Sequence, residues 1–250
     1  MSVLITGSSG GLGLDLGKLF LKNNFDVIFH SRSNIDIIAK NNIQGSGAHQ
    51  IYCELSEYEQ VKTKIYDLFE TDCQPSLIIC NAGASSFEEN TQEDIASWRQ
   101  SFDSNFYSAL NVINACLDVK KNLKFVFNTP FHIICISSIC GIERVSGAPI
   151  QYSIAKSALN NMVKFYAKDL AREGIFLNAI APGNIMFPGS LWERKLQTPE
   201  KKKSFLNSIP SRKFIETSEI YEMINFISSS HSSNIIGQVM ILDGGQTNSF

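Results

Sequence analysis

The sequence predicts a single-domain α/β fold, in which a doubly wound, mostly parallel sheet carries helices on both faces. Short apolar runs recur along the chain, and most are apolar at consecutive positions, as in strands that are buried on both faces. The longer segments between these runs repeat apolar residues every three to four positions, which is the period of a helix. Alternation of strand and helix through one chain is typical of a parallel sheet that is covered on both sides.

The expected strands are the short apolar runs at residues 3–5, 26–30, 50–53, 77–80, 132–136, 176–180 and 239–242. The expected helices show helical periodicity and cover residues 12–23, 57–72, 97–119, 152–173 and 218–229. Residues 183–212 are the least regular part of the chain and carry Pro188, Pro199 and Pro210. A long excursion between core elements often forms a binding loop, so a substrate lid is expected there. No repeat or linker divides residues 1–250, which are expected to form one domain.

Composition argues against several classes of protein. The 250 residues are 44% hydrophobic and carry a formal net charge of -2, unlike an intrinsically disordered chain. This charge offers no overall basic field for a nucleic acid, and the apolar runs are far shorter than the roughly 20 residues that span a membrane. No secretory signal is visible, and the six cysteines contain no C-x-x-C pair. We therefore expect reduced thiols, no metal site and a cytoplasmic location.

A glycine-rich turn, Thr6-Gly7-Ser8-Ser9-Gly10-Gly11-Leu12-Gly13, joins the first expected strand to the first expected helix. Glycines allow a tight turn and let backbone N–H groups approach a pyrophosphate, while the start of the helix supplies positive potential. A plain surface loop has the same composition. The position of the turn favours a dinucleotide site, because this fold binds its ligand at that strand end.

The second expected strand is followed by Ser31 and Arg32, with no acidic residue beside them. A site for NAD usually has a carboxylate here for the ribose hydroxyls, whereas an arginine attracts the 2′-phosphate of NADP. We therefore expect NADPH (NADP+) as cofactor in preference to NADH. The alternative is that Arg32 is an ordinary surface arginine.

Tyr152 and Lys156 lie four residues apart at the start of a long expected helix, which places the phenol and the ammonium on one face. A cation beside a tyrosine stabilises the phenolate, lowers the pKa of the phenol and makes it a usable proton donor and acceptor. Such a pair is often only an exposed helix pair. Here, however, the strand at 132–136 ends in Ser137 and Ser138, which puts a hydroxyl at the same sheet edge as the glycine turn.

These motifs, in this order, resemble the classical short-chain dehydrogenases/reductases, a Rossmann-like family, and in particular its 3-oxoacyl-(acyl-carrier-protein) reductase-like members. The resemblance extends from Val3 to about Gly245. It rests on Thr6-Gly7-x-x-x-Gly11-x-Gly13, Asn81-Ala82-Gly83, Asn105, Ser138, Tyr152-x-x-x-Lys156, Pro182-Gly183 and Asp243-Gly244-Gly245.

The resemblance implies a catalytic role for four residues. Tyr152 would protonate the carbonyl oxygen as general acid, and Ser138 would polarise the carbonyl. Ser137 is adjacent, but the second serine of the pair matches the family's catalytic position. Lys156 would hold the nicotinamide ribose and lower the pKa of Tyr152, while Asn105 would bind a water that connects Lys156 to solvent.

The resemblance also implies a set of cofactor contacts. Asn81 would stabilise the sheet beside the adenosine ribose, Glu54 would lie near the adenine amino group, and the backbone of Ile185 would face the carboxamide. The full set is Gly7, Ser9, Gly11, Leu12, Gly13, Ser31, Arg32, Glu54, Leu55, Asn81, Ala82, Gly83, Tyr152, Lys156, Pro182, Gly183 and Ile185. Two features depart from the family. Phe187 replaces a common threonine, and the connection at 122–130 is unexpectedly aromatic, which either core packing or an interface would explain.

The expected function is NADPH-dependent reduction of a ketone or 3-oxo group to a secondary alcohol. Two alternatives stay open, namely oxidation of a sugar- or polyol-type alcohol with NAD(P)+ and a non-enzymatic dinucleotide-binding protein. A methyltransferase would need neither the serine, the tyrosine nor the lysine. Family members pair the helices that begin at 97 and 152 across a two-fold axis and join through the last strand, so we expect a homotetramer, with a dimer as the alternative.

Overall fold

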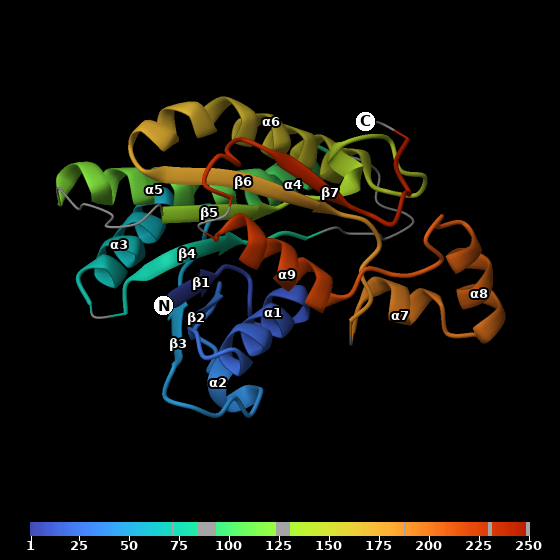
Figure 1. The fold of residues 1–250 in the computed structure, drawn as a ribbon, viewed down its shortest axis with the longest axis horizontal. Helices are drawn as coiled ribbons and strands as arrows, with labels where there is room; N and C mark the ends of the chain where they lie inside the picture. Colours follow the sequence, from blue (N-terminus) through green and yellow to red (C-terminus); the bar gives the residue numbers. More distant parts are fainter. Residues whose placement is uncertain (72, 85–93, 124–130, 188, 230–231, 249–250) are drawn as a thin grey trace.

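The computed structural model places seven parallel strands in one sheet, in the order β3-β2-β1-β4-β5-β6-β7. The structure describes residues 1–248 except for 72, 85–93, 124–130, 188 and 230–231. The strands are β1 (Ser2–Ile5), β2 (Asp26–Ser31), β3 (Ala48–Tyr52), β4 (Pro75–Cys80), β5 (Phe131–Ile136), β6 (Ile175–Pro182) and β7 (Val239–Leu242). Helices cover both faces of this sheet (Figure 1), so the predicted doubly wound α/β fold is confirmed.

The strand order reverses at β1, and this reversal decides where a ligand can bind. From β1 the chain moves outward through β2 and β3, and it then crosses back to β4 on the other side of β1. Helices that follow β1 and β4 diverge to opposite faces, so a crevice opens at the carboxyl ends of these two strands. The glycine turn after β1 and the segment at 81–83 after β4 both lie at this crevice.

The strands are buried on both faces because their apolar residues are continuous. Leu4, Ile78 and Ile133 face one core cluster, and their neighbours Ile5 and Ile79 face the other. All five side chains are at most 1% exposed. Alternate residues of one strand thus serve two separate cores, which explains the run of consecutive apolar residues.

Helices form one layer on each side of the sheet. They are α1 (Gly11–Lys22), α2 (Ile37–Lys40), α3 (Tyr58–Phe69), α4 (Ile95–Phe102), α5 (Ser108–Asn122), α6 (Ile150–Arg172), α7 (Leu191–Lys195), α8 (Pro199–Asn207) and α9 (Thr217–Ile227). Figure 1 shows α3, α5 and α6 on one face and α1 and α9 on the other. The segment with α7 and α8 projects beyond the end of the sheet (Figure 1).

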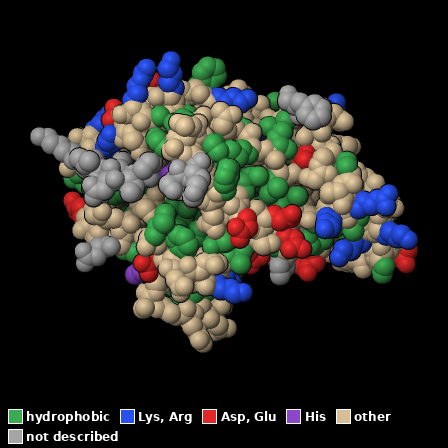
Figure 2. All heavy atoms as spheres, viewed as in Figure 1, with side chains coloured by type: hydrophobic (Ala, Val, Ile, Leu, Met, Phe, Trp, Pro, Cys, Tyr) green, Lys and Arg blue, Asp and Glu red, His purple; other side chains and the backbone are tan. Residues whose placement is uncertain are grey.

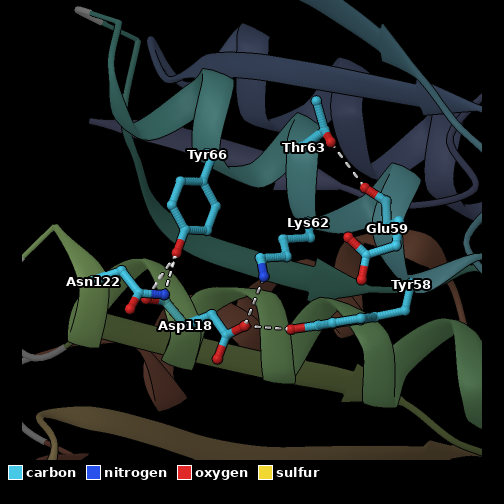
Figure 3. A network of polar contacts seen from close by, with 7 residues as sticks. All are labelled: Tyr58, Glu59, Lys62, Thr63, Tyr66, Asp118 and Asn122. Atoms are coloured by element: carbon cyan, nitrogen blue, oxygen red, sulfur yellow. Dashed lines mark hydrogen bonds and ion pairs between the residues drawn. The ribbon is translucent and has the colours of Figure 1, made fainter.

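A polar network joins α3 to α5 at the outer surface of their layer (Figure 3). Asp118 accepts a hydrogen bond from Tyr58 Oη at 2.7 Å, and its carboxylate lies 3.6 Å from Lys62 Nζ. Tyr66 Oη donates to the Asp118 carbonyl at 3.1 Å and accepts from Asn122 Nδ2 at 2.6 Å. Burial and the bond to Asp118 raise the pKa of Tyr58, so its phenol remains a donor and the helices stay joined.

Two features of the helices differ from the sequence-based expectation. The expected helix at 97–119 is interrupted by a π-helical turn (Asp103–Tyr107) between α4 and α5. The expected irregular segment at 183–212 contains α7 and α8, and Ser190 and Thr198 cap these two helices. Capping by such residues offsets the proline content, because Pro199 lies at the first turn of α8, where a missing N–H costs nothing. The aromatic connection falls mostly on residues 124–130, outside the described residues.

The described residues contain neither a membrane-spanning helix nor a cluster of metal-ligating side chains. None of their helices combines the length and the hydropathy needed to cross a membrane. No group of three or more histidine, cysteine or acidic side chains among them could hold a metal ion. All six cysteines are free; Cys73 and Cys140 are half-buried and the other four are buried.

Candidate functional site

The glycine turn passes directly against the segment that follows β4. Gly7 has φ of 63°, and a Cβ there would lie 2.7 Å from the Ala82 Cα. Thr6 Oγ1 accepts from the backbone N–H groups of Asn81 and Ala82, both at 3.0 Å, and Asn81 Nδ2 donates back to the Thr6 carbonyl at 3.0 Å. The structure therefore brings the predicted residues 6–13 and 81–83 together, and only glycine fits at position 7.

Backbone donors at the start of α1 are not satisfied by a capping side chain. Gly10 occupies the capping position, and it has no side chain that could accept from the first turn. A side chain at Gly13 would also collide, because its Cβ would lie 2.7 Å from the Gly7 carbonyl oxygen. Free N–H groups at a helix start, reached by a side-chain-free turn, suit a phosphate group.

The ends of β2 and β3 carry the residues predicted for the adenosine half of the site. Ser31 is buried, and its hydroxyl donates to the Ser33 carbonyl at 2.6 Å. Arg32 is exposed and forms no ion pair with any described residue. Leu55, after β3, is 5% exposed, and Glu54 beside it is half-buried. These residues lie at neighbouring strand ends because β2 and β3 are paired up to Ser31.

Asn105, Ser138, Tyr152 and Lys156 line one cavity of about 270 Å³ at the carboxyl edge of the sheet. Ser138 follows β5, and its hydroxyl accepts from the Cys140 N–H at 3.1 Å. Tyr152 and Lys156 lie on the first two turns of α6, and the ammonium is 5.9 Å from the centre of the phenol ring. The cavity thus gathers the four residues predicted to be catalytic, from three separate parts of the chain.

The electrostatics of the tyrosine and the lysine differ from the expectation. Burial raises the pKa of Tyr152 to about 12, against the opposing effect of the Ser138 hydroxyl. Burial lowers the pKa of Lys156 to about 8, and its ammonium donates to the Ile136 carbonyl at 2.9 Å. The predicted lowering of the Tyr152 pKa by Lys156 is therefore wrong for this structure, because burial of the phenol dominates. Tyr152 is instead held in the protonated form.

Asn105 lies in the π-helical turn between α4 and α5, and it lines the cavity. Its Nδ2 donates to the carbonyls of Ala84 at 2.8 Å and Ser101 at 3.0 Å, while its Oδ1 is buried and has no partner among the described residues. A Cβ on Gly83 would lie 2.7 Å from that Oδ1 and 3.3 Å from Lys156 Nζ. A buried acceptor without a partner, beside a lysine, is a place for a bound donor such as a water or a ligand hydroxyl.

The backbone after β6 is held so that Ile185 faces the cavity. Ile185 forms a parallel bridge to Ile215, in which Met186 N–H donates to the Ile215 carbonyl and Ile215 N–H donates to the Asn184 carbonyl. On this side of the bridge the hydrogen bonds come from the two neighbours of Ile185, and the N–H and C=O of Ile185 itself take no part in them. Those of Ile185 therefore point to the side opposite Ile215, and Ile185 lines the cavity.

Phe187 and Gly183 also line this cavity. The Phe187 ring packs over the glycine turn, since a Cβ on Gly11 would lie 3.3 Å from its Cε2. Gly183 packs against Asp243, which would be 3.0 Å from a Cβ at that glycine. Pro182 ends β6 and is buried. Ser9, by contrast, is exposed and makes no side-chain hydrogen bond among the described residues.

The segment at 183–212 supplies Trp192 as a wall of the cavity. The Trp192 ring lies 4.3 Å from that of Phe205 in α8, and Phe205 stacks on Phe214 at 5.6 Å. These contacts tie α7 and α8 into one aromatic unit. The side chain of Leu191 lies outside the described part of the chain, and lid motion remains a prediction.

Sequence reasoning missed one residue that holds the site together. His30, at the end of β2, accepts a hydrogen bond from the Gly7 N–H through Nδ1 at 3.0 Å. No motif pointed to it, since a lone histidine in an apolar strand is indistinguishable from a core residue. Only the packing of β2 beside the glycine turn shows the contact.

Known proteins share this architecture over nearly the whole chain. A family model described as enoyl-(acyl carrier protein) reductase matches residues 7–247. Glucose 1-dehydrogenase from Gluconobacter oxydans (strain 621H) is 28% identical over 257 residues, which cover 98% of this chain and 91% of that protein. The 3-oxoacyl-(acyl-carrier-protein) reductase FabG from Thermotoga maritima is 28% identical over 246 residues, which cover 97% and 96%.

Solved structures give the same fold. The Pseudomonas aeruginosa RhlG/NADP active-site complex has a TM-score of 0.84 at 23% identity, and the match covers 98% of this chain and 95% of that one. The family model, the relatives and the fold thus agree with the resemblance that the motifs indicated. The chain belongs to the short-chain dehydrogenase/reductase family of oxidoreductases.

Proposed function

We propose that this protein is an NADPH-dependent reductase that converts a ketone or 3-oxo group to a secondary alcohol. The observation that carries the proposal is the convergence of Ser138, Tyr152 and Lys156 on one cavity, which Ile185 also lines. Hydride transfer to a carbonyl needs a proton donor and a hydrogen-bond donor at the carbonyl oxygen. Tyr152, on α6, supplies the proton donor, and Ser138, after β5, supplies the hydrogen-bond donor.

The residues fit a dinucleotide at this edge of the sheet. The uncapped start of α1 provides backbone donors for a pyrophosphate, and the cradle at Gly7 and Gly13 has no room for a side chain. Arg32 is exposed and without an ion-pair partner among the described residues, as a residue for a 2′-phosphate should be. The RhlG relative was solved with NADP, which supports the same choice.

The protein's own groups then have distinct tasks. When bound, the reduced nicotinamide supplies a hydride to the carbonyl carbon. Tyr152 Oη holds the proton that goes to the carbonyl oxygen, and its raised pKa keeps that proton in place at neutral pH. Ser138 would orient the carbonyl of the substrate. Lys156 would hold the hydroxyl groups of the nicotinamide ribose and keep a positive charge beside the phenol of Tyr152. The Oδ1 of Asn105, which has no partner among the described residues, offers an acceptor for a bound donor such as a water beside Lys156.

Oxidation of a sugar or polyol alcohol is the second candidate function. One relative is named glucose 1-dehydrogenase, and it is as similar as the named 3-oxoacyl reductase. The same residues serve the reverse reaction if the phenol accepts a proton instead. The cavity wall favours neither substrate, since Ile139, Cys140 and Trp192 lie beside the polar Asn184 and Ser190.

Turnover with a panel of substrates tests both candidates. NADPH consumption would be followed at 340 nm with 3-oxoacyl thioesters, simple ketones and cyclic ketones, and NADP+ reduction with glucose and polyols. We expect reduction of at least one carbonyl class with NADPH. Binding of NADPH without turnover of any panel member would favour a non-enzymatic dinucleotide-binding protein, and turnover restricted to alcohols would favour the dehydrogenase.

A further inference from the structure

His30 is buried between the two halves of the adenosine side of the site. It lies on β2, its side chain is 1% exposed, and its ring spans from the glycine turn to the end of β3. The Gly7 N–H donates to Nδ1 at 3.0 Å, and Nε2 lies 3.1 Å from the Cys53 carbonyl oxygen. No other described side chain contacts both segments through hydrogen bonds.

These two partners determine the protonation state of the ring. A backbone N–H can only donate to a nitrogen that carries a lone pair, so Nδ1 is unprotonated. A carbonyl oxygen can only accept, so the proton is on Nε2 and is donated to Cys53. The neutral imidazole therefore satisfies both contacts, and the doubly protonated ring would direct an N–H at the Gly7 N–H.

Burial opposes protonation of the His30 ring, and two neighbouring groups favour it less strongly. Burial lowers the pKa of His30, whereas the Cys53 carbonyl and the carboxylate of Glu54 raise it to a smaller extent. The Cys53 thiol is neutral over the relevant range, because burial raises its pKa to about 11. Arg32, two residues further along, adds a like charge, and the glycine turn at 6–13 contributes no ionisable side chain.

The backbone of His30 is also tied to the turn. Its N–H donates to Ser8 Oγ at 2.8 Å, its carbonyl accepts from the Ser8 N–H at 3.0 Å, and Ser8 Oγ donates to the Ile5 carbonyl at 2.7 Å. Three strand ends therefore meet at this residue. A change in its ring is transmitted to Gly7, where the turn begins, and to the residues after β3.

We propose that His30 is a positioning residue for the dinucleotide: its neutral ring holds the glycine turn and the end of β3 in the binding geometry, and uptake of a proton from solvent releases them. The inference rests on the proposed cofactor. Its consequence is an affinity for the adenosine and pyrophosphate part that falls as the pH decreases, even though the catalytic groups take no part.

Asparagine offers a variant that separates protonation from structure. The Asn side chain places its Oδ1 near the position of the histidine Nδ1, so His30→Asn keeps an acceptor for the Gly7 N–H but cannot take up a proton. His30→Leu removes both contacts. His49→Asn, at an exposed position of β3, and His132→Asn, at the opposite end of the sheet on β5, serve as matched controls.

Calorimetric titration with NAD+ and NADP+ from about pH 4.5 to 8.5 tests the proposal, a range that reaches well below the ordinary histidine pKa of about 6.5. NAD+ is the critical probe, because it lacks the 2′-phosphate, whose own ionisation near pH 6 affects NADP+. For the wild type we expect a dissociation constant that is constant between about pH 6.5 and 7.5 and that rises at lower pH, because burial lowers the pKa of His30; the rise approaches roughly tenfold per pH unit for one proton. His30→Asn should flatten this rise, and both control variants should keep it. His30→Leu should bind weakly at every pH.

The outcomes separate this inference from the proposed function. A flat wild-type profile, or a His30→Asn profile as steep as that of the wild type, would overturn the role of His30 and leave the cofactor assignment intact. Absence of binding of both dinucleotides at pH 8 would overturn the cofactor assignment and this role together.

Nitrogen NMR on the wild-type protein supplies a second readout that needs no variant. It should find the Nε2–H tautomer of His30, and the Gly7 amide signal should shift over the same pH range as the loss of affinity. A ring protonated on Nδ1 at pH 8 would contradict the proposal, whether or not the variants fold.

Discussion

The pKa values of Tyr152 and Lys156 move in opposite directions for one reason, which is removal from water. Burial raises the pKa of the phenol to about 12 and lowers that of the ammonium to about 8. Both shifts favour the neutral form of each group. The tyrosine therefore keeps its proton through the physiological range, whereas the lysine is close to losing its charge.

The pH profile should reflect this difference. The charge on Lys156 is complete below its pKa and is lost as the pH rises through about 8. We expect kcat/KM for reduction, which reports ionisation of the free enzyme, to fall above about pH 8. Tyr152, with its higher pKa, should add no fall in this range. Steady-state rates from pH 6 to 9.5 measure the profile, and a constant value up to pH 9.5 would contradict the assignment.

Cofactor preference should depend on Arg32. Replacing Ser31 with Asp and Arg32 with Gln removes the cation and adds a carboxylate that suits ribose hydroxyls but repels a 2′-phosphate. We expect at least a tenfold shift in the ratio of kcat/KM from NADPH toward NADH, since a charge-assisted contact is lost. Arg172→Gln, at the far end of α6, is the control. Equal efficiency of the wild type with NADPH and NADH would contradict the role of Arg32.

At the scale of elements, periodicity anticipated the sheet and the principal helices but not their irregularities. Short continuous apolar runs such as β5, bounded by turn signals, are typical of strands in a sheet covered on both faces. The π-helical turn at Asn105 could not be predicted, because a five-residue run, Asp103–Tyr107, is too short for its side-chain pattern to distinguish a π-turn from an α-helical turn. Helices α7 and α8 were missed because they are short and bury few side chains.

The candidate site shows the same division. The spacing of Tyr152 and Lys156 places them on one helix face whatever the tertiary structure, so their proximity could be predicted. Contacts between segments could not be predicted: His30 on β2 contacts Gly7 in the turn after the neighbouring strand β1, and the burial that sets the pKa of Tyr152 depends on the whole cavity. The spacing of residues along a helix can be predicted from the sequence, whereas the burial of a side chain depends on the whole fold.

The aromatic unit of Trp192, Phe205 and Phe214 predicts how the proposed lid contributes to catalysis. Trp192 lines the cavity, so Trp192→Ala should raise KM for the substrate several-fold more than it changes the dissociation constant of NADPH. Trp98→Ala, on α4 and outside the cavity, is the matched control.

Hydrogen exchange tests the mobility of the same segment. Residues 183–212 should exchange faster than β4 and β5 in the free protein and slow down when cofactor and substrate bind. Protection equal to that of the central strands, together with unchanged kinetics of Trp192→Ala, would remove the basis for a lid.

At the scale of the whole molecule, apolar side chains remain exposed on two surfaces. Phe165 on α6 is 79% exposed, and Phe226 on α9 and Ile241 on β7 are 53% and 36% exposed. Figure 2 shows hydrophobic side chains gathered over β7 and α9. Since β7 lies at the edge of the sheet, its outer side pairs with no strand in the described part of the chain. Two such surfaces in one chain are what a tetramer with two-fold axes requires.

We therefore expect a homotetramer, with a dimer as the alternative. Light scattering at micromolar concentration measures the mass of the assembly. Phe165→Asp and Phe226→Asp should each disrupt a different interface and reduce a tetramer to dimers, whereas Lys40→Asp, at an exposed position of α2, should have a smaller effect. A wild-type monomer at that concentration would contradict the prediction.

The central claim, that this molecule reduces a carbonyl group with a proton from Tyr152, is tested most directly by measuring NADPH affinity and turnover together in Tyr152→Phe. The phenol oxygen is needed in the transition state and contributes little to holding the cofactor. We predict that the variant binds NADPH within about threefold of the wild type and loses at least a hundredfold in kcat, in line with typical general acid catalysis. A Tyr152→Phe protein that binds NADPH and turns over at the wild-type rate would contradict the account.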